Sequence, residues 1–132
     1  MSRLRRVMLF IPGDSLHKIE KGAGLNVDCV IMDLEDGVAL NQKAEARETI
    51  MQALKNLDFG STERLVRINP VGSGLEMHDL AGTIKARPDG YVIPKVERAK
   101  DVKKISRWLD AEERKNNWKV RSIRLFAIIE TA

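Results

Sequence analysis

The stretch Cys29–Val38, CVIMDLEDGV, joins an apolar strand pattern to a cluster of acids. Its first four residues are typical of a buried β-strand, as is Leu34. Three carboxylates interrupt or follow this run, at Asp33, Glu35 and Asp36. Burying an unpaired carboxylate costs free energy, so acids that serve only solubility rarely sit on such a strand. The stretch therefore predicts a rigid strand that delivers acidic side chains to a functional site.

Four further apolar runs resemble this one in length and in their content of Val, Ile, Leu and Met. They are Val7–Ile11, Leu65–Ile68, Tyr91–Ile93 and Ile123–Ile129. Because most of these runs do not alternate with polar residues, we expect strands that are covered on both faces.

Helical patterns, with apolar residues three or four positions apart, separate these runs. The clearest are Asn41–Leu57, with Asn41 as the expected N-cap, and Ala99–Lys115. Shorter helices are predicted near Ser15–Lys21 and Met77–Ala86. Strands that alternate with helices predict βαβ units and a parallel sheet, so the expected fold class is α/β.

Each predicted strand ends in polar or charged side chains. Right-handed crossovers place the carboxyl ends of all parallel strands at one edge of the sheet, where loops form the active sites of such proteins. Any one of these residues alone could also be a helix cap or an ion-pair partner, so their convergence carries the prediction of a site. They are Asp14 for the first strand, Glu35 and Asp36 for the second, Arg67 and Asn69 for the third, Lys95 and Glu97 for the fourth, and Glu130 and Thr131 for the fifth.

The residue types at this edge restrict the chemistry. Neither Ser15 nor Ser73 lies in a G-x-S-x-G motif, and the segment NPVGSG matches phosphate-binding loops poorly. Carboxylates suit Mg²⁺, which proteins hold through one or two of them and several waters. An arginine binds a carboxylate through two hydrogen bonds, or stabilises negative charge on a carbonyl oxygen. Together these groups favour cleavage or formation of a carbon–carbon bond beside a carbonyl.

The composition sets outer bounds on the function. The 132 residues are 43% hydrophobic and 32% charged, which is typical of one globular domain. The net charge is +4 and only 5% of the residues are aromatic, so we expect no nucleic-acid surface. Cys29 is the only cysteine, and no segment approaches transmembrane length. We expect a cytoplasmic protein that does not bind membranes.

Five segments carry a resemblance to a known family. MLFIPGD (8–14), VIMDLEDGVALNQKAEAR (30–47), RLVRINP (64–70), GYVIPKVE (90–97) and FAIIETA (126–132) resemble, in order and spacing, the citrate lyase β-subunit-like acyl-CoA lyases of the HpcH/HpaI aldolase superfamily. The second segment is most similar to the malyl-CoA and citramalyl-CoA lyase branch. The resemblance implies a TIM (β/α)8 barrel, of which this chain covers about the first five βα units. Residues 1–132 are then the N-terminal portion of a single barrel domain, and we expect the chain to be truncated.

The resemblance also implies roles for individual residues. Glu130 corresponds to a glutamate that ligates Mg²⁺, and Arg67 to an arginine that binds substrate and stabilises the enolate of the acyl thioester. Glu35 and Asp36 line the same pocket. One of them, for which we favour Asp36, is expected to orient metal-bound water or Arg67. Lys95 is expected at the rim near the substrate. The residues expected to meet coenzyme A are Phe10, Pro12, Gly13 and Lys18.

These roles imply a Mg²⁺-dependent lyase that cleaves a C–C bond of a 3-hydroxyacyl-CoA thioester, malyl-CoA or citramalyl-CoA, through an acetyl-CoA enolate. The base and a second metal-ligating aspartate would come from beyond Ala132. One alternative is a citrate lyase β-subunit acting on citryl-acyl-carrier protein, with the basic segment Lys100–Arg107 facing the acidic carrier. Another is a non-catalytic barrel fragment that binds a ligand or assembles with partner chains. The resemblance further implies a homo-oligomer, specifically a trimer.

Overall fold

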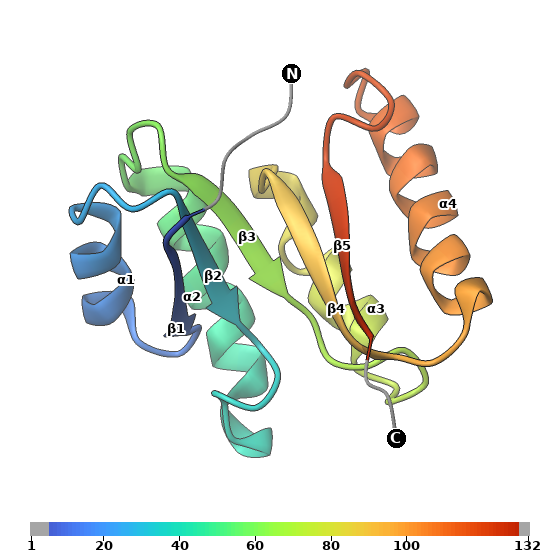
Figure 1. The fold of residues 1–132 in the computed structure, drawn as a ribbon, viewed down its shortest axis with the longest axis horizontal. Helices are drawn as coiled ribbons and strands as arrows, with labels where there is room; N and C mark the ends of the chain where they lie inside the picture. Colours follow the sequence, from blue (N-terminus) through green and yellow to red (C-terminus); the bar gives the residue numbers. More distant parts are fainter. Residues whose placement is uncertain (1–5, 130–132) are drawn as a thin grey trace.

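A computed structural model describes residues 6–129, which form a parallel five-stranded sheet with helices along one face (Figure 1). The strand order is β1-β2-β3-β4-β5, and every neighbouring pair is parallel. Sequential order of parallel strands is the arrangement of successive βα units in a TIM barrel, so the predicted fold class is confirmed. The strands are β1 (Met8–Pro12), β2 (Cys29–Asp33), β3 (Glu63–Arg67), β4 (Gly90–Val96) and β5 (Arg124–Ile129).

The helices agree with the sequence pattern in the middle of each element and differ at the ends. Asn41 is not the N-cap that we expected, because a 3-10 turn precedes the second helix and Gln42 occupies the cap. The helix expected at Met77–Ala86 is two short elements, since the first ends at Gly82. The elements are α1 (Leu16–Ala23), η1 (Leu40–Gln42), α2 (Lys43–Asn56), α3 (Glu76–Ala81), η2 (Ile84–Ala86) and α4 (Ala99–Lys115).

The main core lies between the helices and the outer face of the sheet. Outward residues of the strands pack against the apolar stripes of the helices, as Met32 and Val66 do with Ile50 of α2 in one cluster of buried side chains. Burying each such side chain contributes about 1.5–3 kcal/mol to folding. This core fixes which residues of each strand face outward, and therefore which face inward.

A second, smaller cluster lies on the inner face of the sheet, where the interior of a barrel would be. It contains Cys29, Ile31, Leu65 and Val92, with Phe126 packed against them. Asp33 and Arg67 follow on the same face, because they lie two residues beyond Ile31 and Leu65 and pair in register. The inner face therefore changes from apolar to ionic at the carboxyl edge of the sheet.

Cys29 is a buried free thiol in this inner cluster. No helix within residues 6–129 has the length and apolar content needed to cross a membrane. The basic side chains on one face of α4 are exposed to solvent; they are Lys100, Lys103, Lys104 and Arg107.

Candidate active site

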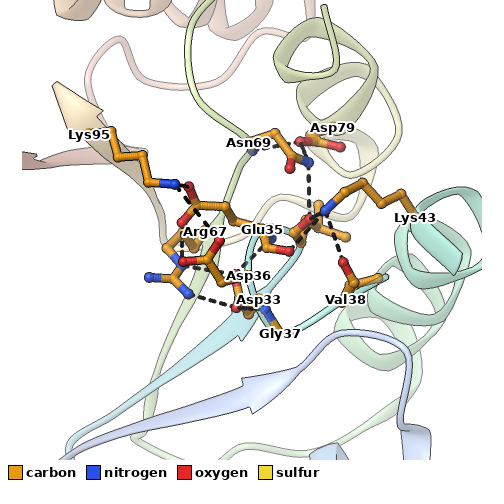
Figure 2. Close-up of polar contacts among 11 residues, drawn as sticks. Asp33, Glu35, Asp36, Gly37, Val38, Lys43, Arg67, Asn69, Asp79 and Lys95 are labelled. Atoms are coloured by element: carbon orange, nitrogen blue, oxygen red, sulfur yellow. Dashed lines mark hydrogen bonds and ion pairs between the residues drawn. The ribbon is translucent and has the colours of Figure 1, made fainter. Parts of the chain in front are cut away.

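The centre of the site is an ion pair between Asp33 at the end of β2 and Arg67 at the end of β3 (Figure 2). Arg67 Nε donates to Asp33 Oδ1 at 2.8 Å, and Nη2 donates to Oδ2 at 2.7 Å. The backbone N–H groups of Glu35 and Gly37 donate to the same two oxygens, each at 2.8 Å. One buried carboxylate thus accepts four hydrogen bonds and fixes both the arginine and the loop that follows β2.

The electrostatics of this pair keep both groups charged. Burial raises the pKa of Asp33, but the hydrogen bonds from Arg67 and from the Glu35 and Gly37 backbone outweigh that effect and leave the pKa lowered. The hydrogen bond to Asp33 raises the pKa of Arg67. The site therefore presents a permanent cation that is held in one orientation by its own counter-ion.

Glu35 and Asp36 differ in environment although they are adjacent in sequence. The Glu35 side chain is 5% exposed, with Oε1 3.6 Å from Arg67 Nε and Oε2 3.3 Å from Lys95 Nζ. Within residues 6–129, Oε2 has no hydrogen-bond partner. The Asp36 side chain is 71% exposed and lies 3.9 Å from Lys95 Nζ. The structure thus brings Glu35, Asp36, Arg67 and Lys95 together, as the sequence predicted.

Lys95 reaches the site through an unusual backbone conformation. It has a φ of 53°, in the left-handed region that side-chain-bearing residues rarely adopt. The β4–β5 register shifts between Ile93 and Val96, so Lys95 lies at an irregularity of the strand. Such irregularities re-aim a side chain, and here the ammonium group points at Glu35.

A cleft of about 450 Å³ opens beside the ion pair. The Phe10 ring forms one wall and contacts the Arg67 guanidinium, with its centroid 5.0 Å from Cζ. Pro12 also lines the cleft, together with Asp36 and Gly37. Two residues expected to meet coenzyme A lie apart from these lining residues. Gly13 packs against the backbone of Asp33 and the side chain of Ile50, and Lys18 is exposed on α1.

A second layer of polar contacts supports the loop after β2 from the side of α2. Lys43 Nζ donates to the carbonyl oxygens of Leu34, Glu35 and Val38. Asn69 Nδ2 donates to the same Leu34 oxygen at 3.0 Å and to Asp79 Oδ2 at 2.7 Å. These contacts fix the backbone that carries the site acids (Figure 2).

The oxygen donors at this edge fit a hard divalent cation in type. Mg²⁺ takes one or two carboxylates and completes its shell with water, and Glu35 supplies a buried carboxylate oxygen without a hydrogen bond. In the described part of the chain, no cluster of three or more potential metal-ligating side chains occurs. Glu130, the expected ligand, follows β5 in sequence and lies outside the described residues.

Sequence reasoning missed the contacts by which Asp33 and Lys43 build the site. Asp33 was taken as one of three acids, yet it is the one that holds Arg67. Asp33 lies two residues after Ile31, so the two side chains lie on the same face of the strand. This spacing could have identified Asp33 as an acid on the inner face of the sheet. Lys43 falls within the helical pattern Asn41–Leu57, and no sequence signal marks it as buried.

Comparison with known proteins identifies the family. The sequence profile of the family described as HpcH/HpaI aldolase/citrate lyase matches residues 6–132. The chain belongs to this family. It is 45% identical over 100 residues to human mitochondrial citramalyl-CoA lyase, a match that covers 74% of this chain and 29% of that protein. It is 33% identical over 130 residues to the citrate lyase subunit beta of Leuconostoc mesenteroides subsp. cremoris, covering 98% of this chain and 43% of that protein.

Solved structures show the same relationship. The Mycobacterium tuberculosis protein CitE in complex with magnesium and acetate has a TM-score of 0.72 and 31% identity, over 95% of this chain and 44% of that chain. The same protein in complex with magnesium, acetoacetate and coenzyme A has a TM-score of 0.61 and 37% identity, over 74% of this chain and 35% of that chain. The chain therefore spans less than half the length of these relatives.

Proposed function

We propose that the full-length protein is a Mg²⁺-dependent lyase that cleaves a C–C bond of malyl-CoA or citramalyl-CoA through an acetyl-CoA enolate. The observation that carries this proposal is the Asp33–Arg67 pair, which holds a guanidinium beside a cleft at the carboxyl edge of the sheet. The human citramalyl-CoA lyase and the CitE complex with coenzyme A support the substrate class.

Arg67 is the residue proposed to stabilise the enolate. Its Nε and Nη2 atoms are occupied by Asp33, whereas Nη1 has no hydrogen bond among residues 6–129. The Nη1 amino group is therefore available to donate to the thioester carbonyl oxygen. As the C–C bond breaks, negative charge grows on that oxygen, and a fixed cation stabilises this charge without reorganising.

Glu130 is proposed to hold the metal, and Glu35 or Asp36, for which we favour Asp36, is proposed to orient metal-bound water or Arg67. Bound Mg²⁺ would polarise the hydroxyl and carboxylate oxygens of the substrate. Lys95 helps to hold the Glu35 carboxylate in place through its 3.3 Å contact with Oε2. The proton of the substrate hydroxyl passes to a base outside the described residues. The electrons of the C–C bond then pass to the thioester, which leaves as the enolate, and the hydroxyl carbon leaves as a carbonyl product.

The wall of the cleft formed by β1 is proposed to meet the coenzyme A portion. Phe10 and Pro12 line the cleft on this side. Gly13 and Lys18 continue the same segment into α1, and the Lys18 ammonium suits a phosphate of the coenzyme.

The experiment is to assay malyl-CoA and citramalyl-CoA cleavage by the full-length protein and two variants, Arg67→Ala and Glu130→Ala. We expect acetyl-CoA formation to fall by about 10²–10³-fold in Arg67→Ala, as it does when an oxyanion donor is removed from an enzyme. Lys115→Ala, at an exposed position at the end of α4, is the control and should retain full activity. Near-normal activity in both site variants would refute the mechanism.

A second candidate is the β-subunit of a citrate lyase, acting on a citryl thioester carried by an acyl carrier protein. The Leuconostoc relative, which matches 98% of this chain, favours it. The exposed basic face of α4 between Lys100 and Arg107 suits an acidic carrier. Assaying the same cleavage with the acyl group on free coenzyme A and on carrier protein distinguishes the two candidates.

Three broader expectations stay predictions. Residues 1–132 are proposed to be the N-terminal portion of a single TIM-barrel domain, consistent with the share of the relatives that they match. The proposed assembly is a homo-oligomer, with a trimer as the expectation. The proposed location is the cytoplasm, whereas the human relative is described as mitochondrial.

A further inference from the structure

The Lys43 ammonium group lies in a ring of three backbone carbonyl oxygens. Nζ donates to Leu34 O at 2.6 Å, to Glu35 O at 2.9 Å and to Val38 O at 3.1 Å. The residue is 8% exposed, although lysine is rarely buried without a carboxylate partner. Its recorded partners among residues 6–129 are all carbonyl oxygens, so it binds the backbone rather than another side chain.

The three carbonyls belong to the loop that carries the site acids. The loop is also held from β3, because Asn69 Nδ2 donates to Leu34 O and the Leu34 N–H donates to Arg67 O at 2.9 Å. Figure 2 shows Lys43 approaching the loop from α2, with the Glu35 carboxylate directed toward Arg67 and Lys95. The loop therefore lies between the supporting lysine and the site.

A cation at this point has a physical reason. Three carbonyl dipoles that converge on one point repel one another, and a buried carbonyl without a partner is costly. The Glu35 carboxylate contacts Arg67 and Lys95, but its Oε2 has no hydrogen bond in the described part of the chain, so its position also depends on the path of the loop backbone. A loop fixed before ligand binding also avoids the entropic cost of ordering it later.

We propose that Lys43 is a positioning residue whose ammonium acts as a built-in monovalent cation for this carbonyl ring and thereby holds Glu35 at the site. The inference rests on the proposed lyase function for its activity readout alone. Its structural readout, the protection of the loop 34–38, is independent of what the protein catalyses.

The experiment compares amide hydrogen exchange and thioester cleavage in the full-length protein and three variants, Lys43→Ala, Lys43→Met and Lys55→Met. Lys43→Ala removes three methylenes and the ammonium, a space that n-propylammonium fills. In Lys43→Met, the uncharged methionine side chain fills most of this space, so n-propylammonium cannot bind there. Lys55 is exposed on the same helix and serves as the matched control.

We expect faster exchange at residues 35–38 in both Lys43 variants, with β3 and α4 unchanged. Cleavage should fall by about 10- to 100-fold, as when a group that orients a catalytic ligand is removed. Propylammonium should restore both loop protection and cleavage in Lys43→Ala but not in Lys43→Met. Unchanged exchange at residues 35–38, or an equal increase throughout the protein, would overturn the inference.

The unsubstituted protein provides a test that does not depend on the folding of variants. The ammonium protons of Lys43 are held by three carbonyls, so they should exchange slowly with water and give an observable NMR signal. Ammonium protons that exchange with water as fast as those of the exposed Lys55 would overturn the inference. If the wild-type protein cleaves neither thioester, the proposed function fails. Loop exchange and the ammonium signal then decide the role of Lys43 by themselves.

Discussion

Asp33 and Arg67 lie directly opposite each other in the β2–β3 register and meet through two hydrogen bonds on the inner face of the sheet. Because Asp33 also accepts the N–H groups of Glu35 and Gly37, the same carboxylate sets the start of the loop. The orientation of the arginine and the path of the loop are therefore coupled through one side chain.

Replacing Asp33 with Asn should destabilise the protein by about 3–5 kcal/mol, the usual cost of breaking a buried ion pair from one side. The amide keeps the shape of the carboxylate but leaves Arg67 without a counter-ion and places a donor against backbone N–H groups. Urea denaturation of the full-length protein measures the change. Asp110→Asn on α4 is the control and should change stability by less than about 0.5 kcal/mol.

The lowered pKa of Asp33 predicts how stability depends on pH. Unfolding returns the carboxyl group to an ordinary pKa of about 3.9, so its contribution is fully present above that value. The contribution is lost as the pH falls through the lower pKa of the folded state. The free energy of unfolding of the wild type should therefore fall more steeply below about pH 4 than that of Asp33→Asn. Parallel pH curves for the two proteins would contradict this account.

Changing Arg67 to Lys should remove activity although it conserves the charge. An ammonium group lacks the planar fork that binds both oxygens of Asp33, and it cannot also present a donor to the substrate. We expect kcat/KM to fall by about 10²–10³-fold in steady-state assays. Arg114→Lys, at an exposed position near the end of α4, should leave kcat/KM unchanged.

Glu35→Gln should affect activity more than stability. Arg67 keeps Asp33 as its partner, and the Lys95 side chain is 46% exposed, so solvent compensates for much of the lost ion pair. We expect a loss of about 1 kcal/mol or less in the free energy of unfolding. Mg²⁺ affinity and kcat should each fall by about tenfold or more. A large loss of stability with normal metal affinity would assign Glu35 a purely structural role.

Gly37→Ala tests the space beside Asp33. A Cβ at Gly37 would lie 2.7 Å from Asp33 Oδ2, so either the carboxylate or the loop must move. Overpacking of this kind usually costs about 1–3 kcal/mol. Gly24→Ala is a matched control, because a Cβ there would meet its nearest atom at 3.6 Å, an ordinary contact. Equal effects of the two substitutions on thermal unfolding would count against the tight fit at Gly37.

The fold was predictable because its signals are local. Short apolar runs separated by helical patterns gave the order and type of the elements, and all five strands lie where those runs occur. The ends were less predictable. Helix α2 starts after a 3-10 turn, which satisfies its first turn differently from the N-cap that Asn41 suggested. A 3-10 turn at the start of a helix shifts its boundary by one or two residues, which a capping pattern in the sequence does not specify.

The sequence predicted where the site residues gather, but not which of them contact each other. Polar residues at strand ends had to meet at one edge, and Glu35, Asp36, Arg67 and Lys95 do meet there. Which acid holds Arg67 depends on the strand register, and register follows from the packed sheet rather than from any single strand. The burial of Lys43 depends likewise on how α2 docks beside the loop.

The left-handed backbone of Lys95 has a consequence for the evolution of the protein in the laboratory. A side chain in this conformation costs about 1 kcal/mol or more, which glycine would avoid. Selection for thermal stability alone should therefore favour Lys95→Gly. This more thermostable variant would lose the ammonium group that faces Glu35. At position 95, a gain in thermal stability should therefore come with a loss of catalytic rate.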